Sequence, residues 1–466
     1  EPLDMKSSDQ FWKTKADAES GVNALYFGGV PYLHNTDVGG GWTPKATMWG
    51  GIVSGLYVDK RKDRTFTTAS EGCNFNIESF DDIAMKYWHE FYKGISRANF
   101  VIANIPTMTG VLDEATINNY VAQGKFFRAY GYFWLVKEFG GVPYISEPYT
   151  STEGMYKERL SAEEVYKKIE ADLLDIVNGD ALPNKTFYEN GCYVTRAMAQ
   201  TLLAQVYLQW AGAPLNGGAD YYGKAAQMAL KVINDSPHEL IHPNGTTDDL
   251  NSAYNVIKTT KESAEIIYAK EYNYTNYSVG NSYACRSIGT DAFQWGVFHP
   301  GGDVLYNAYL PCDMLLNSYA SNDIRGHEKQ FFFKQYTDAE GKTYTLNNAG
   351  NWAWFDENAL ISGHDGDYNM PVFRFAEVLL IAAEGLARTN HEDNAVGGAK
   401  YYLNQVRKRA GLADETATGN DLIQSILTER LHELPLEFKI WDDIRRTRLY
   451  PEASTESGKL KWTALA

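Results

Sequence analysis

The chain has 466 residues, enough to bury a large core in one big helical domain or in two or three domains. Its net charge of −16 argues against binding to a nucleic acid backbone as the main function. Aromatic residues are abundant, with 32 Tyr, 21 Phe and 11 Trp, so part of them is expected at the surface as platforms for a ligand.

Few sequence features indicate the cellular compartment of the protein. No apolar run reaches the roughly 18 to 20 residues that span a bilayer. The chain begins at Glu1 without a methionine or a signal peptide, which predicts a mature or trimmed protein. No C-x-x-C pair occurs, so neither a zinc knuckle nor a redox motif is indicated, and the disulfide state stays open. The four cysteines are Cys73, Cys192, Cys285 and Cys312.

The N-terminal segment predicts one helix followed by a long loop. Ser7 and Gln10 have the spacing of a capping box, and the helix is expected to continue through Tyr26. Between Gly28 and Asn76, clusters of glycine break every helical pattern, and aromatic residues are interspersed. We interpret residues 28–76 as a long ordered loop, and such loops in compact domains are usually functional.

Strong helical periodicity follows this loop. Ser161 is expected to cap one of the helices, because Glu164 stands three residues further on. Predicted helices cover Ile83–Asn104, Ile117–Glu138, Ser161–Val177, Thr195–Gly212 and Ala219–Asn234.

Residues 236–370 show little helical periodicity and are rich in Asn, Gly, Tyr and Trp. We interpret this stretch as an irregular ligand-binding insertion that packs on the long N-terminal loop. The predicted organisation is therefore residues 1–235 with the first helices and the loop, residues 236–370 as the insertion, and residues 371–466 as C-terminal helices.

The last hundred residues contain three helical patterns with charges at fixed places. They read PVFRFAEVLLIAAEGLARTN from Pro371, YYLNQVRKRAGL from Tyr401, and ILTERLHELPLEFKIWDDIRR over Ile426–Arg446. Glu377 and Glu384 are seven residues apart and share one helical face. A helix bundle tied by ion pairs is the favoured interpretation, and a catalytic carboxylate pair is the alternative.

This block resembles the C-terminal signature of the SusD/RagB family. The matching pieces, in order, are R-x-A-E-V-x-L-x-x-A-E, L-N-x-V-R-x-R-A-G-L, E-R-x-x-E-L-x-x-E and D-x-R-R. One departure is Phe438-Lys439, where the family usually has a small residue followed by Arg.

The resemblance implies a mainly α fold, a tetratricopeptide-like helical repeat scaffold with a large irregular loop-rich insertion. Two helix pairs are similar to tetratricopeptide units. The resemblance also implies a cell-surface, lipid-anchored outer-membrane protein without enzymatic activity or cofactor, working with a SusC-like TonB-dependent transporter. A signal peptide and an anchor cysteine would then precede this chain. The helix pairs are Thr195–Gly212 with Ala219–Asn234, and Phe375–Arg388 with Ala395–Ala410.

Two motifs suggest metals. His238-Glu239-x-x-His242 matches the zinc-peptidase pattern, in which two histidines four apart on a helix bind zinc. Pro237 and Pro243 leave room for only about one helical turn, so this zinc site is disfavoured. The acidic residues Asp356, Asp365 and Asp367 match no complete calcium loop, so turn residues are favoured and no metal site is predicted.

Aromatic residues in loop-like sequence are the better candidates for function. Sugar rings stack on Trp and Tyr, and sugar hydroxyls need polar partners such as Asp, Asn and Arg. We therefore expect a glycan-binding protein that captures oligosaccharides for its transporter; the alternatives are peptide uptake on the same fold and, least favoured, a zinc peptidase. The predicted ligand-binding residues are Asp37, Trp42, Trp49, Tyr57, Tyr283, Arg286, Trp295, Arg325, Trp352 and Trp354.

Overall fold

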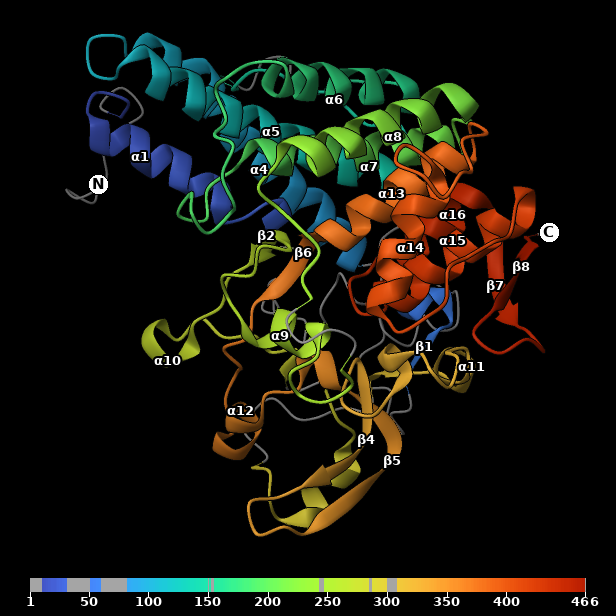
Figure 1. The fold of residues 1–466 in the computed structure, drawn as a ribbon. Coiled ribbons are helices and arrows are strands. Elements are labelled where there is room, and N and C mark those ends of the chain that lie inside the picture. The colour runs from blue at the N-terminus through green and yellow to red at the C-terminus, as the bar shows by residue number, and fades with distance from the viewer. Residues whose placement is uncertain are drawn as a thin grey trace. The chain divides into compact units, whose positions relative to one another are not determined.

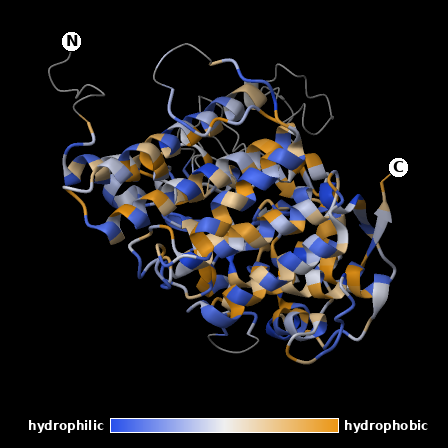
Figure 2. Ribbon diagram, turned by 90° about the horizontal axis from the view of Figure 1, so that it is seen from above, coloured by the Kyte–Doolittle hydropathy of each residue, from blue (hydrophilic) through white to orange (hydrophobic). Residues whose placement is uncertain are grey.

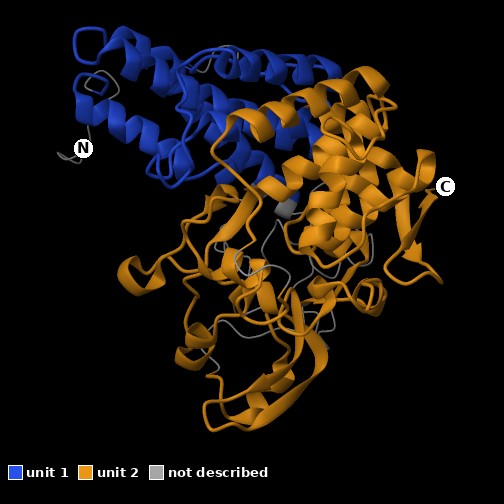
Figure 3. Ribbon diagram, in the orientation of Figure 1, with its two compact units in different colours: residues 1–33, 82–206 blue, residues 34–81, 207–466 orange. Residues whose placement is uncertain are grey.

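The computed structural model describes residues 11–31, 51–59, 82–149, 151, 155–242, 247–284, 287–299 and 308–465. Helices dominate it and the strands are short, which confirms the predicted mainly α fold (Figure 1). The chain divides into two compact units, residues 1–33 with 82–206 and residues 34–81 with 207–466 (Figure 3). The predicted insertion and the predicted C-terminal part thus fall in the same unit.

The first unit contains long helices that cross closely. Gly124 and Gly131 of α5 face α4, and a Cβ atom on either would lie 2.9 Å from Ile102 or Ile95. A larger residue would therefore push the two helices apart. The Ser161 capping box of α6 is present as predicted, whereas the first helix is capped by Thr14, and Ser7 and Gln10 lie outside the described residues. The helices are α1 (Lys15–Asn23), α4 (Asp82–Asn104), α5 (Glu114–Phe139) and α6 (Ala162–Val177).

The two predicted helix pairs have tetratricopeptide-like packing. Trp210 of α7 stacks on Tyr221 of α8 at 4.3 Å between ring centroids. Gly385 of α13 lets α8 approach, since its Cβ would lie 2.5 Å from the Tyr222 carbonyl oxygen. Figure 2 shows helices on which hydrophobic and hydrophilic residues alternate along the ribbon. The pairs are α7 (Arg196–Ala211) with α8 (Gly218–Asp235), and α13 (Phe375–Ala387) with α14 (Ala399–Arg409).

The third C-terminal pattern, predicted over Ile426–Arg446, is two helices in the structure. Helix α15 covers Gly419–Glu433 and α16 covers Ile440–Thr447. Phe438 lies between them with φ 61°, a left-handed conformation that costs a residue with a side chain more than it costs glycine.

Short elements make up residues 236–370. The strands form two-stranded antiparallel pairs. One pair joins residues 57–59 of the long N-terminal loop to residues 308–311 of the insertion, as expected from the sequence. The pairs are β1 (Tyr57–Asp59) with β3 (Ala308–Pro311), β2 (Ile266–Lys270) with β6 (Met370–Arg374), β4 (Phe332–Thr337) with β5 (Thr343–Asn351), and β7 (Leu449–Ala453) with β8 (Leu460–Ala464). The short helices are α9 (Ala253–Thr259), α10 (Tyr274–Tyr277), α11 (Asp313–Asn317) and α12 (Glu357–Ser362).

Buried ion pairs hold the C-terminal helices together, as predicted. Glu384 contacts Arg446 at 2.6 Å, and Glu377 contacts Lys439 at 3.0 Å. Deeper in the unit, Glu433 binds three arginines. We call this deeper network the ion-pair frame; it consists of Glu265, Asp323, Arg325, Arg374, Arg409, Glu429 and Glu433, all of them buried. Each carboxylate of the frame is paired with guanidinium groups inside the protein, and Glu377 and Glu384 are likewise paired with cations, which is the ion-paired bundle expected from the sequence.

Candidate ligand-binding site

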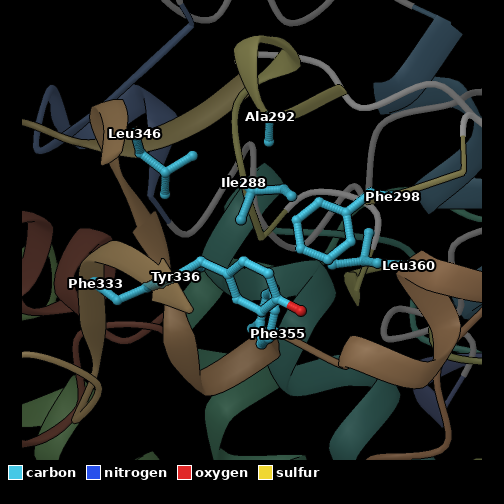
Figure 4. Close-up of a cluster of buried hydrophobic side chains, with 8 residues drawn as sticks. All are labelled: Ile288, Ala292, Phe298, Phe333, Tyr336, Leu346, Phe355 and Leu360. Carbon is cyan, nitrogen blue, oxygen red and sulfur yellow. The ribbon is translucent and has the colours of Figure 1, made fainter. Parts of the chain in front are cut away.

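The insertion is built around an aromatic cluster, which we call the aromatic lobe. Eight buried residues from the segments 288–298, 333–346 and 355–360 form its centre. Figure 4 shows Phe298, Tyr336 and Phe355 turned toward one another, with Phe298 and Tyr336 at 4.9 Å between centroids. Trp295, Tyr344 and Trp352 pack against the cluster while staying partly exposed. Aromatic rings are therefore packed continuously from the interior of the lobe to its surface.

One such surface is the Trp295 stack, formed by Trp295, Tyr336 and Tyr344. The Trp295 ring lies 4.9 Å from Tyr344 at an interplanar angle of 21°, and 6.2 Å from Tyr336 at 8°. Tyr336 and Tyr344 are direct cross-strand partners in the β4–β5 hairpin. Direct partners on one face of a hairpin stand close enough to stack, so strand pairing fixes this platform.

Polar groups lie at the edge of the Trp295 stack. The Tyr344 hydroxyl donates to Asp338 at 3.0 Å, and the Tyr336 hydroxyl donates to Glu357 at 2.5 Å. Asp338 also accepts the backbone N–H of Lys342, and this bond lowers the pKa of the Asp338 carboxyl below its ordinary value. Asp338 therefore stays ionised at neutral pH and offers acceptors beside an aromatic face. A sugar ring with its hydroxyls needs that combination.

A second partly exposed surface surrounds Trp352. One face of its indole packs inward on Phe355 at 5.1 Å and 17°. Its Nε1 donates to Asn255 at 2.7 Å, which fixes the ring orientation. Two lysine ammonium groups lie over this ring, Lys258 at 4.0 Å and Lys329 at 5.5 Å from the centroid. These contacts hold the ring rigidly, so its partly exposed part would meet a ligand at low entropic cost.

Three predicted ligand-binding aromatics lie inside the protein and not on its surface. Tyr57 stacks on Tyr309 at 4.4 Å and donates its hydroxyl to the carbonyl oxygen of Pro435. Trp354 packs between Tyr309 and Tyr283, and all of these residues are buried. The structure thus brings Tyr57, Tyr283 and Trp354 together in an internal stack. The prediction of ligand contact is corrected for these three, because neighbouring rings occupy their faces.

Arg325 is also corrected, since it belongs to the ion-pair frame. Its side chain is 0% exposed. The guanidinium contacts Asp323 at 2.7 Å, Glu429 at 2.6 Å and Glu433 at 3.2 Å. Although burial alone would lower its pKa, these carboxylates raise the pKa of Arg325 well above its ordinary value. It has no free face for a ligand.

The remaining predictions divide into two groups. Trp295 and Trp352 lie at the surface of the aromatic lobe and stay proposed contacts. Asp37, Trp42, Trp49 and Arg286 lie outside the described residues. Sequence reasoning missed Tyr336 and Tyr344, although the alternation in FFFKQYT and KTYTLN around an Asp-Ala-Glu-Gly turn is a hairpin signal that points to them.

The two metal motifs take structural roles. Helix α8 ends at Asp235, and residues 238–242 are not helical, so His238 and His242 lack the helical spacing of a zinc peptidase. Asp367 accepts the backbone N–H groups of Tyr274 and Thr275, and Asp356 accepts that of Asp367. Over the described part of the chain, no group of three or more His, Cys, Asp or Glu residues is placed to hold a metal ion.

Comparison with known proteins assigns the chain to a family. The protein-family model of the SusD family matches residues 293–461. A second family model, described as starch-binding associating with outer membrane, matches residues 53–208. The chain belongs to the SusD/RagB family. Among the helices that the structure describes, none is long and apolar enough to cross a membrane.

Relatives of this SusD/RagB chain are similar over nearly their whole length. SusD-like protein P2 from Formosa agariphila is 27% identical over 475 residues, which cover 98% of this chain and 88% of the relative. The crystal structure of a SusD superfamily protein from Parabacteroides distasonis is 25% identical, with a TM-score of 0.81 and coverage of 96% and 91%. Surface glycan-binding protein A from Bacteroides uniformis is 22% identical, with a TM-score of 0.75 and coverage of 93% and 88%.

Proposed function

We propose that this protein binds oligosaccharides through stacking on the aromatic lobe and has no catalytic activity of its own. The observation that carries the proposal is the Trp295 stack, in which the partly exposed rings of Trp295 and Tyr344 lie nearly parallel to each other and to the buried ring of Tyr336, with ionised Asp338 at the edge. Structures with this fold support it, because one is described in complex with laminarihexaose and another with a xylogluco-oligosaccharide.

The further steps of the proposal follow from family membership. The protein would be lipid-anchored at the outer membrane and would deliver its glycan to a SusC-like TonB-dependent transporter. Co-purification of the two proteins from native membranes tests this step, and a transporter recovered equally well from cells lacking this chain would argue against the assembly.

Calorimetric titration with a panel of neutral oligosaccharides tests glycan binding. The Trp295→Ala variant should bind about fivefold to tenfold more weakly, because one stacked ring contributes about 1 kcal/mol. Tyr156→Ala is the matched control, since Tyr156 is an exposed aromatic in the other unit and is expected to leave affinity unchanged. No binding to any glycan of a broad panel would refute the proposal.

Salt dependence separates glycan from peptide as the cargo. Stacking and neutral hydrogen bonds change little with ionic strength, so affinity for a neutral glycan should be nearly constant between low and high salt. The net charge of −16 would instead favour basic peptides, whose binding should weaken as salt is added. A strong fall in affinity with salt would therefore favour peptide uptake.

A further inference from the structure

Lys258 occupies an unusual position beside Trp352. It lies in the last turn of α9, and its ammonium group is surrounded by the rings of Trp352, Tyr368 and Phe355 at 4.0, 5.1 and 5.8 Å from their centroids. We call these three rings and the amine the lysine cage. Aromatic faces attract a cation but cannot accept its protons as a carboxylate does.

No described residue forms a salt bridge or a hydrogen bond with the Lys258 amine. Lys439 of the same unit is paired, by contrast: it contacts Glu377 at 3.0 Å and donates to the Val372 carbonyl oxygen at 3.0 Å. Asp356 and Glu357 act on the Lys258 amine without contact, and a second cation, Lys329, lies over the same Trp352 ring. Its charge is therefore poorly compensated.

This environment favours the neutral amine. Burial lowers the pKa of Lys258 to about 7, while Asp356 and Glu357 oppose part of that effect. At pH 7 about half of such amines are neutral, whereas an exposed lysine with a pKa of about 10.4 is neutral in fewer than one molecule in a thousand. A desolvated lysine in an apolar pocket is the standard form of an activated amine nucleophile.

Lys258 lines a small cavity of about 60 Å³ together with the apolar side chains of Ile257, Met370 and Pro371. Its polar lining comes from Tyr254, Asn281 and Asn369, and from Arg374 and Glu437, which are engaged with each other at 2.7 Å. The space admits a group of a few heavy atoms. A small neutral electrophile fits this combination of size and polarity better than an anion does.

We propose that Lys258 is a reactive amine that condenses reversibly with aldehydes. The Nζ lone pair forms a bond to the carbonyl carbon, the carbonyl π electrons move to oxygen, and proton transfer from nitrogen to oxygen gives a carbinolamine. Loss of water then leaves an imine, so no oxidant or reductant is needed. The aldehyde comes either from a small free hydroxyaldehyde or from the open-chain reducing end of a saccharide. This reaction does not depend on glycan binding by the Trp295 stack.

Reductive trapping tests the proposal on the whole protein. Glycolaldehyde with cyanoborohydride at pH 7 should convert Lys258 to the secondary amine at least tenfold faster than Lys137, as measured by peptide mass spectrometry. Lys137 is a matched control because its ammonium lies 3.9 Å from the Trp134 centroid, which is the same cation–π contact. At pH 10 the selectivity should disappear. Equal or slower labelling of Lys258 at pH 7 overturns the proposal.

Two variants make the test specific. Lys258→Arg keeps a cation over Trp352 but removes the nucleophile, so the fast-labelling site should vanish while Lys137 labels as before. Glu357→Gln removes a charge that raises the pKa of Lys258, so labelling at pH 6 should rise roughly twofold to threefold. A fast site that persists in Lys258→Arg, or an unchanged or lower rate in Glu357→Gln, overturns the proposal.

The source of the aldehyde is separated by two further reagents. Maltotriose has a reducing end, and its alditol has none. Labelling by maltotriose but not by the alditol identifies a saccharide reducing end as a substrate. Labelling by glycolaldehyde alone restricts the site to small free aldehydes. Trapping by the alditol, which contains no carbonyl group, would overturn the imine chemistry. Calorimetric titration of the Trp295→Ala variant with oligosaccharides reports on glycan binding separately. The proposed glycan binding and the proposed imine chemistry can therefore fail independently of each other.

Discussion

The ion-pair frame and the aromatic lobe belong to the same unit and use opposite kinds of side chain in their interiors. The frame buries arginines and glutamates, and its charges are paired inside the protein. The lobe buries rings, and its packing continues outward to Trp295 and Trp352. The conspicuous charged motif therefore lies where side chains are paired inside the protein. The side chains that a ligand could reach lie at the edge of the aromatic lobe.

Breaking the frame should have the largest effect. Glu433 contacts Arg325, Arg374 and Arg409, and Glu433→Gln leaves three buried cations with one carboxylate fewer. We expect the free energy of unfolding to fall by about 3 to 5 kcal/mol in urea titrations. As a control, Lys167→Met removes an exposed pair with Glu163 and should change stability by less than about 0.5 kcal/mol. A loss below about 1 kcal/mol for Glu433→Gln would contradict the frame's structural role.

Two tryptophans, one in the internal stack and one at the surface of the lobe, sharpen the comparison next. Trp354 is 5% exposed, and Trp354→Ala should cost about 3 to 5 kcal/mol of stability by opening a cavity. Trp295→Ala should cost clearly less stability, because its ring is partly exposed, yet weaken oligosaccharide binding. Urea unfolding and calorimetry of both variants measure the contrast. Equal destabilisation by both would mean that the Trp295 stack is part of the core.

The smallest expected effect concerns pH. Burial, followed by the neighbouring Arg325, lowers the pKa of His432 to about 3. An unfolded histidine takes up its proton near pH 6.5, so this contribution is complete above pH 6.5 and is lost as pH falls toward 3. Between pH 6 and 5 stability should decrease by about 1.4 kcal/mol per pH unit from this group.

Urea titrations of His432→Gln at the same pH values check this assignment, because the slope should become shallower by that amount. His327 is the control, because the Ser321 carbonyl and Asp248 raise its pKa. This half-buried histidine therefore contributes to stability with the opposite sign: its contribution is present at low pH and is lost as pH rises. A slope that survives His432→Gln would contradict the assignment.

Local chemistry made much of the helical scaffold predictable. Helices α4, α6 and α8 begin and end close to their predicted bounds, and Ser161 caps α6 as its spacing with Glu164 indicates. The ion pairing of Glu377 and Glu384 was also predictable, because seven-residue spacing places both on one face. Prolines flanking His238–His242 correctly predicted that the zinc-like motif would not form a continuous helix.

The candidate site was much less predictable. Tyr57 and Trp354 stand in loop-like sequence just as Trp295 does, yet they are interior while Trp295 reaches the surface. The difference arises from β1–β3 pairing and from ring contacts with Tyr309, residues far apart along the chain. Composition reveals that aromatic rings are abundant, but only long-range packing decides which faces are covered.

Sequence by itself determined the helices, their caps, the charged stripes and the family, because these depend on residues within a few turns of one another. Tertiary structure decided which arginines and rings are inside, and it placed Lys258 among three rings that lie far from it along the chain. The physical reason is that burial and the reactivity it creates depend on desolvation by distant parts of the chain, and no local pattern of residues encodes that.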